Sequence, residues 1–160
     1  LRSVIMMRNK LSSMNSVLEF TDDAYTIDLS NNPDLKILNV LAKFGPAVVK
    51  KFDLSHTGVK SLYQIKNLNI IHLNLVHTGK LPLGNFNHFY ESLDAEGSQN
   101  DFSPYLNNKP VQYLNIHQTP FKNYKVLTTL KKLKTLIVTK GKLAQNVRDN
   151  LAKGCVIIEK

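Results

Sequence analysis

Five histidines are the residues of this chain best suited to bind a metal ion, and two of them occur in matching surroundings. His56 lies in the segment Ser-His-Thr-Gly, and His77 lies 21 residues later in Val-His-Thr-Gly. A structural zinc site needs four ligands, usually Cys and His at short spacing, but this pair has no evident third ligand and no nearby cysteine. We therefore expect no metal site. Equivalent turns of neighbouring repeats would place the two side chains about 5 Å apart.

Two carboxylates, Asp28 and Asp53, also occupy equivalent positions. Carboxylates on neighbouring strands repel each other, which can raise the pKa of one of them and prepare it for acid–base chemistry. Lys51 lies two residues from Asp53 on the same side of an extended strand, so an ammonium group is available to neutralise this charge. The sequence contains no Gly-rich phosphate loop, no HExxH and no GxSxG. We therefore expect no enzymatic activity and no cofactor.

A repeated pattern of apolar residues must position these side chains. An apolar residue at position 1 is followed by others at positions 4 and 6 and by a small polar residue at position 9. The clear copies are Val49-x-x-Phe52-x-Leu54-x-x-Thr57, Ile70-x-x-Leu73-x-Leu75-x-x-Thr78 and Val111-x-x-Leu114-x-Ile116-x-x-Thr119. More divergent copies are Ala24-x-x-Ile27-x-Leu29-x-x-Asn32 and Leu133-x-x-Leu136-x-Val138-x-x-Gly141, and partial copies start at Leu1 and Cys155.

Positions 4 and 6 are two residues apart, so their side chains point to the same face of a short strand. Gly or Pro at position 10 then indicates a turn. A second apolar run follows at helix-like spacing, which predicts a helix or turn that covers the inner face of the strand. The runs are Leu62/Ile65/Leu68, Phe86/Phe89/Leu93, Leu127/Leu130/Leu133 and Leu143/Val147/Leu151.

This pattern resembles the leucine-rich repeat, L-x-x-L-x-L-x-x-N/C-x-L with a period of 20–29 residues. The resemblance implies an α/β fold, a right-handed solenoid with a parallel β-sheet on its concave face and helices or turns on its convex face. In that family the position-9 Asn bonds the backbone of the neighbouring turn. Asn32 matches this feature, whereas Thr57, Thr78 and Thr119 offer a hydroxyl that can bond backbone groups instead.

The spacing of the repeats is irregular at one place. The first positions from Ala24 onward are separated by 25, 21, 41 and 22 residues. We interpret the long interval as an inserted surface loop at 94–109, because this stretch is rich in Gly, Ser, Asn and Asp and matches no copy of the template. We thus expect a single domain at 1–160, with repeats starting near 1, 24, 49, 70, 111, 133 and 155.

The charge of the chain is concentrated in its last third. The net charge is +9, and residues 109–160 hold eleven Lys or Arg against Asp149 and Glu159, whereas residues 1–108 balance ten against ten. This asymmetry is typical of an anionic or nucleic-acid contact or of a solvated outer face. Only three cations are Arg, which argues against phosphate recognition. The candidate anion-contacting residues are Lys122, Lys125, Lys131, Lys132, Lys134, Lys140 and Lys142.

Bulk properties limit the remaining choices. No apolar run approaches the length of a transmembrane helix, and no signal peptide is visible. The lone Cys155 excludes an internal disulfide framework and favours a reducing compartment such as the cytoplasm, with a bacterial periplasm or cell surface as alternatives. The oligomeric state does not follow from the sequence.

The strand face that points away from the core is the candidate binding surface. Its central residues are Lys51, Asp53 and Ser55, then His72, Asn74 and Val76, then Tyr113, Asn115 and His117. Polar residues with one Tyr and two His suit partner recognition, and the concave face of a solenoid is commonly the binding face. We predict a non-catalytic module that binds a protein partner, as part of a larger protein. The alternatives are a structural spacer between domains and an anion or nucleic-acid binder using the lysine-rich third.

Overall fold

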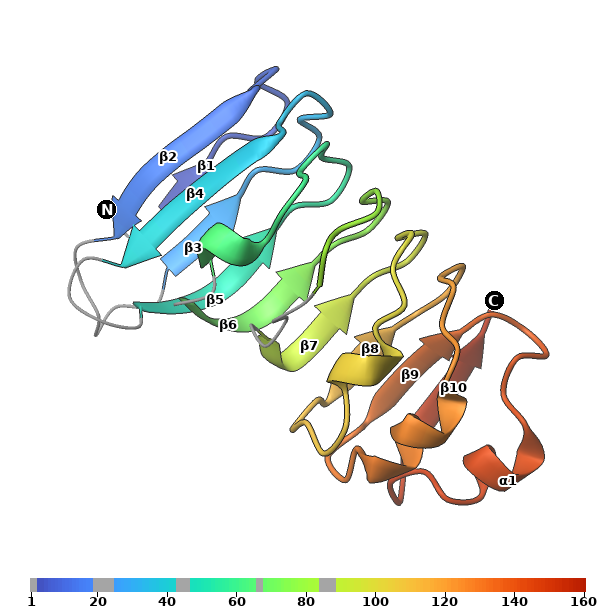
Figure 1. Ribbon diagram of the computed structural model, residues 1–160. Coiled ribbons are helices and arrows are strands. Elements are labelled where there is room, and N and C mark those ends of the chain that lie inside the picture. The colour runs from blue at the N-terminus through green and yellow to red at the C-terminus, as the bar shows by residue number, and fades with distance from the viewer. Residues whose placement is uncertain (1–2, 19–24, 43–46, 66–67, 84–88) are drawn as a thin grey trace.

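The computed structural model describes residues 3–18, 25–42, 47–65, 68–83 and 89–160, and parallel strands dominate it. Eight of them form one sheet in the order β1-β3-β5-β6-β7-β8-β9-β10, and the two ends of the chain lie at opposite ends of the array (Figure 1). We call one strand of this main sheet, with the segment that returns to the next strand, a rung. The strands are β1 Ser3–Ile5, β3 Tyr25–Asp28, β5 Ala47–Asp53, β6 Leu68–Asn74, β7 Phe89–Asp94, β8 Tyr113–Asn115, β9 Thr135–Val138 and β10 Val156–Glu159. The chain is thus a parallel β-solenoid, as the repeats predict.

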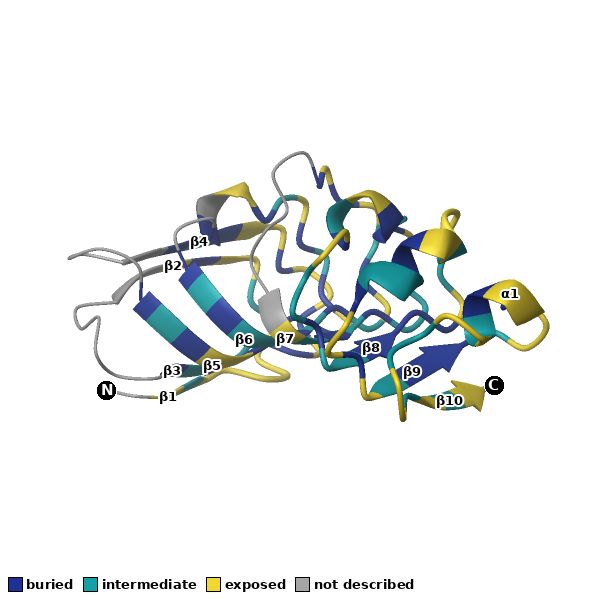
Figure 2. Ribbon diagram, turned by 90° about the horizontal axis from the view of Figure 1, so that it is seen from below, coloured by how far each residue is buried: buried dark blue, intermediate teal, exposed yellow. Residues whose placement is uncertain are grey.

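The return segments change character along the array. In the first rungs they are strands, β2 Ser13–Leu18 and β4 Ile37–Ala42, which pair in parallel as a second sheet. In the later rungs they are short 3₁₀-helices, η1 Tyr63–Ile65, η2 Ser103–Tyr105 and η3 Tyr124–Thr129, and one short α-helix, α1 Gln145–Arg148. Figure 2 shows these segments on one side of the molecule and the main sheet on the other.

The expected helical runs are only partly helical. The runs around Leu127 and Val147 overlap η3 and α1, and the run around Leu62 overlaps η1. Leu68, Phe89 and Leu93, however, lie in strands β6 and β7, so their assignment to a covering helix or turn is wrong. Phe86 lies outside the described residues. The error has a physical reason, because apolar residues three or four apart also occur where a return segment runs into the next strand.

The core lies between the main sheet and the return segments. At position 4 and position 6 the internal rungs bury their side chains almost completely; these are Ile27, Phe52, Leu73, Leu93, Leu114 and Leu136, with Leu29, Leu54, Leu75, Ala95, Ile116 and Val138. Each buried side chain of Leu size contributes about 1.5–3 kcal/mol relative to exposure. A rung covers its inner face only with its neighbours, so the rungs must stack to be stable.

The 94–109 stretch is not an insertion. Strand β7 pairs with β6 and with β8, so that Leu73, Leu93 and Leu114 are aligned across three strands. The turn after β7 continues the same pattern, because Leu75 N donates to Asp94 O at 2.7 Å and Ala95 N donates to Asn115 O at 2.9 Å. The 41-residue interval therefore contains one further repeat, and residues 95–109 are its turn and return segment, buried through Phe102 and Leu106.

The two terminal copies of the template also form rungs. Val4 of β1 aligns with Ile27, as the template predicts. At the other end Ile157, not Ile158, aligns with Leu136, so the predicted register of the last copy is wrong by one residue. Ile158 consequently belongs to the outer face of the sheet, where it is 41% exposed. Cys155 precedes β10 and packs, half-buried, against the core, and this burial raises the pKa of its thiol.

The turns that follow the strands share one backbone conformation. The residue at position 8 has a positive φ in successive rungs: Arg8, Asn31, His56, His77, Gly97 and Gln118. His56 and His77 are thus turn residues, and their ring centroids lie 4.9 Å apart, which confirms the predicted spacing. A Cβ on Gly97 would lie 2.2 Å from His77 Nδ1, so the absence of a side chain there leaves room for the imidazole of the preceding rung.

Candidate partner-binding face

The outer face of the main sheet carries two continuous columns of side chains. At position 3 the strand register aligns Thr26, Lys51, His72, Ser92, Tyr113, Thr135 and Val156. At position 5 it aligns Asp28, Asp53, Asn74, Asp94, Asn115, Ile137 and Ile158. The structure therefore places the predicted position-3 and position-5 residues side by side, and it adds Ser92 and Asp94. We call this surface the strand face.

The position-5 column has a local structural role. In five successive rungs the side-chain oxygen of Asp or Asn accepts a hydrogen bond from the backbone N–H two residues later. The pairs are Asp28 with Ser30, Asp53 with Ser55, Asn74 with Val76, Asp94 with Glu96 and Asn115 with His117, at 3.0–3.3 Å. This side-chain turn fixes the path of the chain as it leaves each strand. Sequence reasoning recognised the residue types at this position but not the bonds.

The amide of Asn74 separates Asp53 from Asp94 along the column, whereas Asp28 and Asp53 are direct neighbours. Asn74 Nδ2 donates to Asp53 Oδ2 at 3.0 Å, and Lys51 Nζ lies 3.3 Å from the same oxygen. The neutralisation of Asp53 by Lys51 is therefore confirmed. Asp53 also accepts from Ser55 Oγ at 2.7 Å, and it is only 6% exposed. Asp53 and Ser55 are thus committed to contacts inside the protein, which leaves them little capacity for a partner.

A second set of bonds surrounds Asp94. Asn115 Nδ2 donates to Asp94 Oδ1 and to Glu96 Oε2, both at 3.0 Å, and Lys160 Nζ lies 2.9 Å from Glu96 Oε2. Tyr113 Oη donates to Asp94 Oδ2 at the long distance of 3.4 Å. Asn115 is 2% exposed, so this predicted contact residue acts by holding two carboxylates in place.

The pKa values of Asp94 and Tyr113 are raised in this environment, whereas that of Glu96 is lowered. Burial is the main cause that raises the pKa of Asp94, with a further contribution from the Glu96 charge. The hydrogen bond from Lys160, followed by that from Asn115, lowers the pKa of Glu96. Burial also raises the pKa of Tyr113, and the nearby Asp94 charge acts in the same direction. Tyr113 is therefore a neutral donor at physiological pH.

A shallow hollow of about 250 Å³ lies on the strand face. Four of its lining residues were predicted as partner contacts, namely Lys51, His72, Asn74 and Tyr113, and Ser92, Asp94 and Leu73 complete it. Ser92 and Asp94 were missed because β7 was not recognised as a strand. The predicted residues Val76 and His117 lie outside this hollow; His117 Nδ1 lies 3.5 Å from Thr139 Oγ1 and is largely buried.

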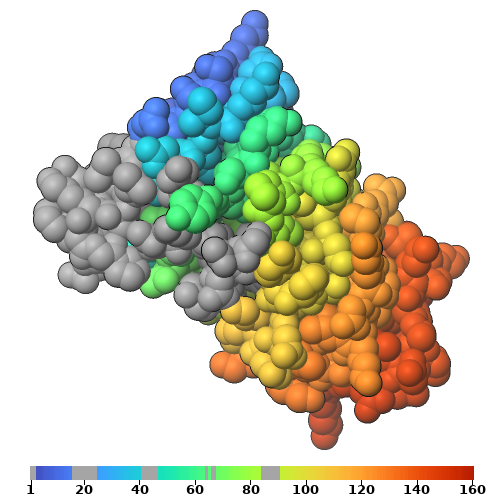
Figure 3. Space-filling model, viewed as in Figure 1, coloured from blue at the N-terminus to red at the C-terminus, as the bar shows by residue number. Residues whose placement is uncertain are grey.

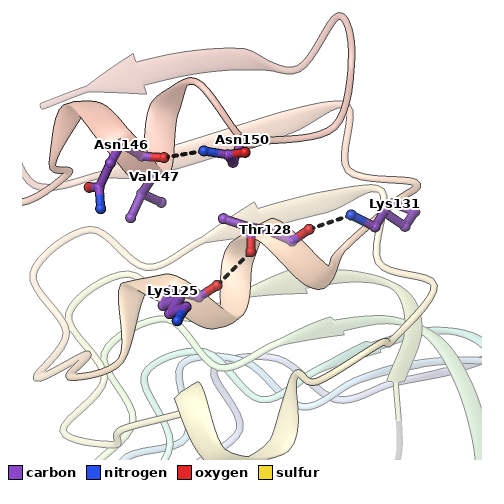
Figure 4. Close-up of a pocket in the computed structure, with 6 residues that line it drawn as sticks. All are labelled: Lys125, Thr128, Lys131, Asn146, Val147 and Asn150. Carbon is purple, nitrogen blue, oxygen red and sulfur yellow. Dashed lines mark hydrogen bonds between the residues drawn. The ribbon is translucent and has the colours of Figure 1, made fainter.

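The lysine-rich surface lies elsewhere on the molecule. All seven predicted lysines are exposed, and Lys125 and Lys131 line a hollow of about 430 Å³ between η3 and α1, together with Thr128, Asn146, Val147 and Asn150 (Figure 4). Lys131 Nζ donates to Thr128 O at 2.8 Å. Figure 3 shows the return side of the solenoid, with the C-terminal third of the chain in orange and red at one end of the array.

The charges of the strand face differ from those of the whole chain. At positions 3, 5 and 7 of the described rungs from β3 to β10 stand four carboxylates, Asp28, Asp53, Asp94 and Glu96, and two ammonium groups, Lys51 and Lys160. The net charge of this face is −2, whereas that of the protein is +9. The excess of lysine is therefore carried by turns and return segments.

In comparisons with known proteins, no family model, curated protein or solved structure matches the chain. Within the described residues no three His, Cys, Asp or Glu side chains are grouped as metal ligands. Among those residues there is also no helix with the length and apolar composition needed to span a membrane.

Proposed function

We propose that this chain is a non-catalytic module that binds a protein partner through the strand face. The observation that carries the proposal is the hollow in this face, where Lys51, His72, Asn74 and Tyr113 meet Ser92 and Asp94. These side chains combine one aromatic ring, several hydrogen-bonding groups and both signs of charge. Such a composition suits a protein interface, which combines aromatic anchors with a polar rim.

We further propose that the solenoid is a right-handed leucine-rich-repeat array whose strand face is concave. Asn32 supports this assignment, because its side chain bonds both its own turn and the turn of the preceding rung. Its Nδ2 donates to Leu29 O and to Met6 O at 2.8 Å, and its Oδ1 accepts from Asn9 N at 2.9 Å and Leu11 N at 3.1 Å. The recovered repeat at β7 also brings the long interval into the 20–29-residue range of that family.

Capture of partners from a lysate of the source organism tests the protein-binding proposal. The bait is the chain itself, compared with a triple variant His72→Ala/Tyr113→Ala/His117→Ala, at low and at high salt. A partner retained at high salt and lost on the triple change would support recognition by the strand face. Equal capture by both baits, or capture by neither, would favour a spacer that only positions neighbouring domains.

A second candidate function is binding of an anionic ligand to the lysine-rich surface. The hollow between η3 and α1 favours it, because Lys125 and Lys131 lie there with the carboxamides of Asn146 and Asn150. Binding of inorganic polyphosphate or heparin, measured by calorimetry at several salt concentrations, tests this candidate. A lysine-dependent contact loses affinity steeply with salt, and Lys125→Gln/Lys131→Gln should weaken it, whereas Lys50→Gln/Lys60→Gln serves as a charge-matched control.

A further inference from the structure

Asp94 differs from Asp53 and Glu96 of the strand face in the way its charge is balanced. Asp53 Oδ2 lies 3.3 Å from Lys51 Nζ, and Glu96 Oε2 lies 2.9 Å from Lys160 Nζ. The ion pairs formed by the described residues do not include Asp94. Its Oδ1 is occupied by Asn115 and by the N–H of Glu96, whereas among the described residues its Oδ2 has only the long contact with Tyr113. Asp94 thus has a carboxylate oxygen that is free to accept.

The hollow places this oxygen beside groups that suit a planar cation. Tyr113 supplies an aromatic ring next to Asp94, and Ser92 and Asn74 add a hydroxyl and a carboxamide. A guanidinium group donates through a rigid fork to carboxylates and stacks on aromatic rings, whereas an ammonium group does neither as well. The volume of about 250 Å³ admits one long side chain but no folded element.

Two cations, Lys51 and Lys160, lie near Asp94, but they oppose such a ligand only weakly. Lys51 is held at Asp53, so part of its charge is already balanced. The face as a whole carries a net charge of −2, which favours a basic side chain although the chain as a whole is basic. Attraction at this face is local, because interactions between exposed charges more than about 8 Å apart are largely screened at physiological ionic strength.

We propose that the partner inserts an arginine side chain into the hollow, with its guanidinium against Asp94 Oδ2 and Tyr113. This inference rests on the proposed function, since it names the chemistry of the partner at the same face. It identifies Asp94 as a specificity-determining residue, and it makes the partner a protein with an exposed basic docking segment.

The test uses a defined probe instead of the unidentified partner. Acetyl-Gly-Arg-Gly-amide is titrated into the ¹⁵N-labelled chain, and the backbone amide shifts of Ser92, Asp94 and Tyr113 are followed. The peptide with citrulline in place of arginine, which has nearly the same shape but no charge, is the ligand control. Because charge-assisted hydrogen bonds exceed neutral ones by about 1.4 kcal/mol, we expect arginine to produce shifts at roughly tenfold lower concentration than citrulline.

Two matched variants locate the contact. Asp94→Asn keeps the turn bond, because Asn74 and Asn115 make that bond at the same position. Asp28→Asn is the control, since Asp28 makes the same bond in a rung outside the hollow. We expect Asp94→Asn to abolish the preference for arginine over citrulline and Asp28→Asn to retain it. Equal shifts with both peptides, or an arginine preference that survives Asp94→Asn, would overturn the proposal.

Partner capture separates this inference from the proposed function. A partner that is lost on the triple His72/Tyr113/His117 change and also lost on Asp94→Asn supports both. A partner that is lost on the triple change but bound equally by Asp94→Asn leaves the binding face standing and overturns the arginine contact. Capture that is indifferent to every one of these changes contradicts the binding face and the arginine contact together.

Discussion

The turn after β3 and the turn after β8 occupy the same place in their rungs but are held by different means. Asn32, at position 9 after β3, is fully buried and bonds three backbone groups of the preceding rung as well as Leu29 O and Ser30 O of its own. Thr119, at position 9 after β8, makes one side-chain hydrogen bond with the described residues, from its Oγ1 to Ile116 O of its own turn at 2.8 Å.

This difference shows that the rungs are not coupled equally. The amide of Asn32 both donates and accepts, so it spans two rungs, whereas the hydroxyl of Thr119 closes only its own turn. Thr57 behaves like Thr119, whereas Thr78 Oγ1 also lies 3.2 Å from Ser98 Oγ of the following rung. Asn100 again reaches the preceding rung, through Leu81 N and Gly79 O. In a solenoid the total stability is approximately the sum of rung stabilities and interfaces between neighbours. Side chains that span rungs therefore determine where cooperativity is strongest.

The largest expected effect follows from removing the amide of Asn32. Asn32→Ala removes the partner of backbone groups in two rungs, of which Leu29 O and Ser30 O are buried. A buried group left without a partner costs about 1–3 kcal/mol. We expect a loss of roughly 3 kcal/mol or more in the free energy of unfolding, measured by urea denaturation.

The matched change at the other turn is Thr119→Val, which removes one hydrogen bond and keeps the shape of the side chain. We expect this change to cost about 1 kcal/mol. Hydrogen exchange should show increased opening at Asn9 and Leu11 in Asn32→Ala, but no spread beyond its own turn in Thr119→Val. Similar losses in the two variants would contradict the difference between the turns.

A second pair of variants compares the next position of two turns. Gly58 and Gly79 both occupy position 10, but a Cβ on Gly58 would lie 2.2 Å from Pro33 O, whereas a Cβ on Gly79 meets nothing within 4 Å. Gly58→Ala must displace backbone, so we expect it to destabilise the protein by about 1–3 kcal/mol. Gly79→Ala should be neutral or stabilise by up to about 1 kcal/mol. Thermal denaturation of both variants measures the contrast, and equal melting temperatures would refute it.

Much of the strand face follows from the sequence because the strand period is simple. Residues two apart share a face, so the positions of Lys51, His72 and Tyr113 relative to Phe52, Leu73 and Leu114 could be predicted. The turn position of His56 and His77 could be predicted for the same reason, since matching repeats stack in register.

Two features escaped prediction because their signals are ambiguous. The β7 repeat has the small Ala95 at position 6, and Phe89 and Leu93 are spaced as in a helix, so the segment resembles a helix followed by a polar loop. The return strands β2 and β4 contain short apolar stretches that periodicity does not separate from helix. The position-5 column shows a third limit. The sequence places Asp53 beside Asp28 but does not reveal that Asn74 donates to Asp53 or that Asn115 donates to Asp94.

The third prediction concerns the pH dependence of Asp94, a position-5 residue for which Asn is the natural alternative in adjacent rungs. Its raised pKa, caused mainly by burial, means that ionisation costs native-state stability. Lys51, His72, Tyr113, Glu96 and Lys160 are the titratable or charged groups around it. We expect Asp94→Asn to be more stable than the parent at pH 7 by at most about 0.5 kcal/mol, because the carboxylate is partly exposed and screened by solvent. The difference in the free energy of unfolding between variant and parent should disappear as the pH falls through the native pKa of Asp94 toward its ordinary value of 3.8. Chemical denaturation at several pH values measures this difference, and a difference that grows at low pH would contradict the prediction.

The smallest expected effect comes from the turn after β7, where the pKa of Glu96 is lowered and not raised as it is for Asp94. Its pKa is lowered first by the hydrogen bond from Lys160, so its ionised form stabilises the native state above its ordinary value of 4.5. This contribution is lost as pH falls through the lowered pKa. Lys160→Gln should raise the pKa of Glu96, followed by NMR titration of its side-chain carboxyl, and should cost less than about 0.5 kcal/mol because the pair is partly exposed and screened by salt. Asn115 still donates to Glu96 in this variant, so its pKa should stay below the ordinary value. An unchanged Glu96 titration in Lys160→Gln would mean that Asn115 alone sets the pKa, and that the last rung is not electrostatically tied to the β7 turn.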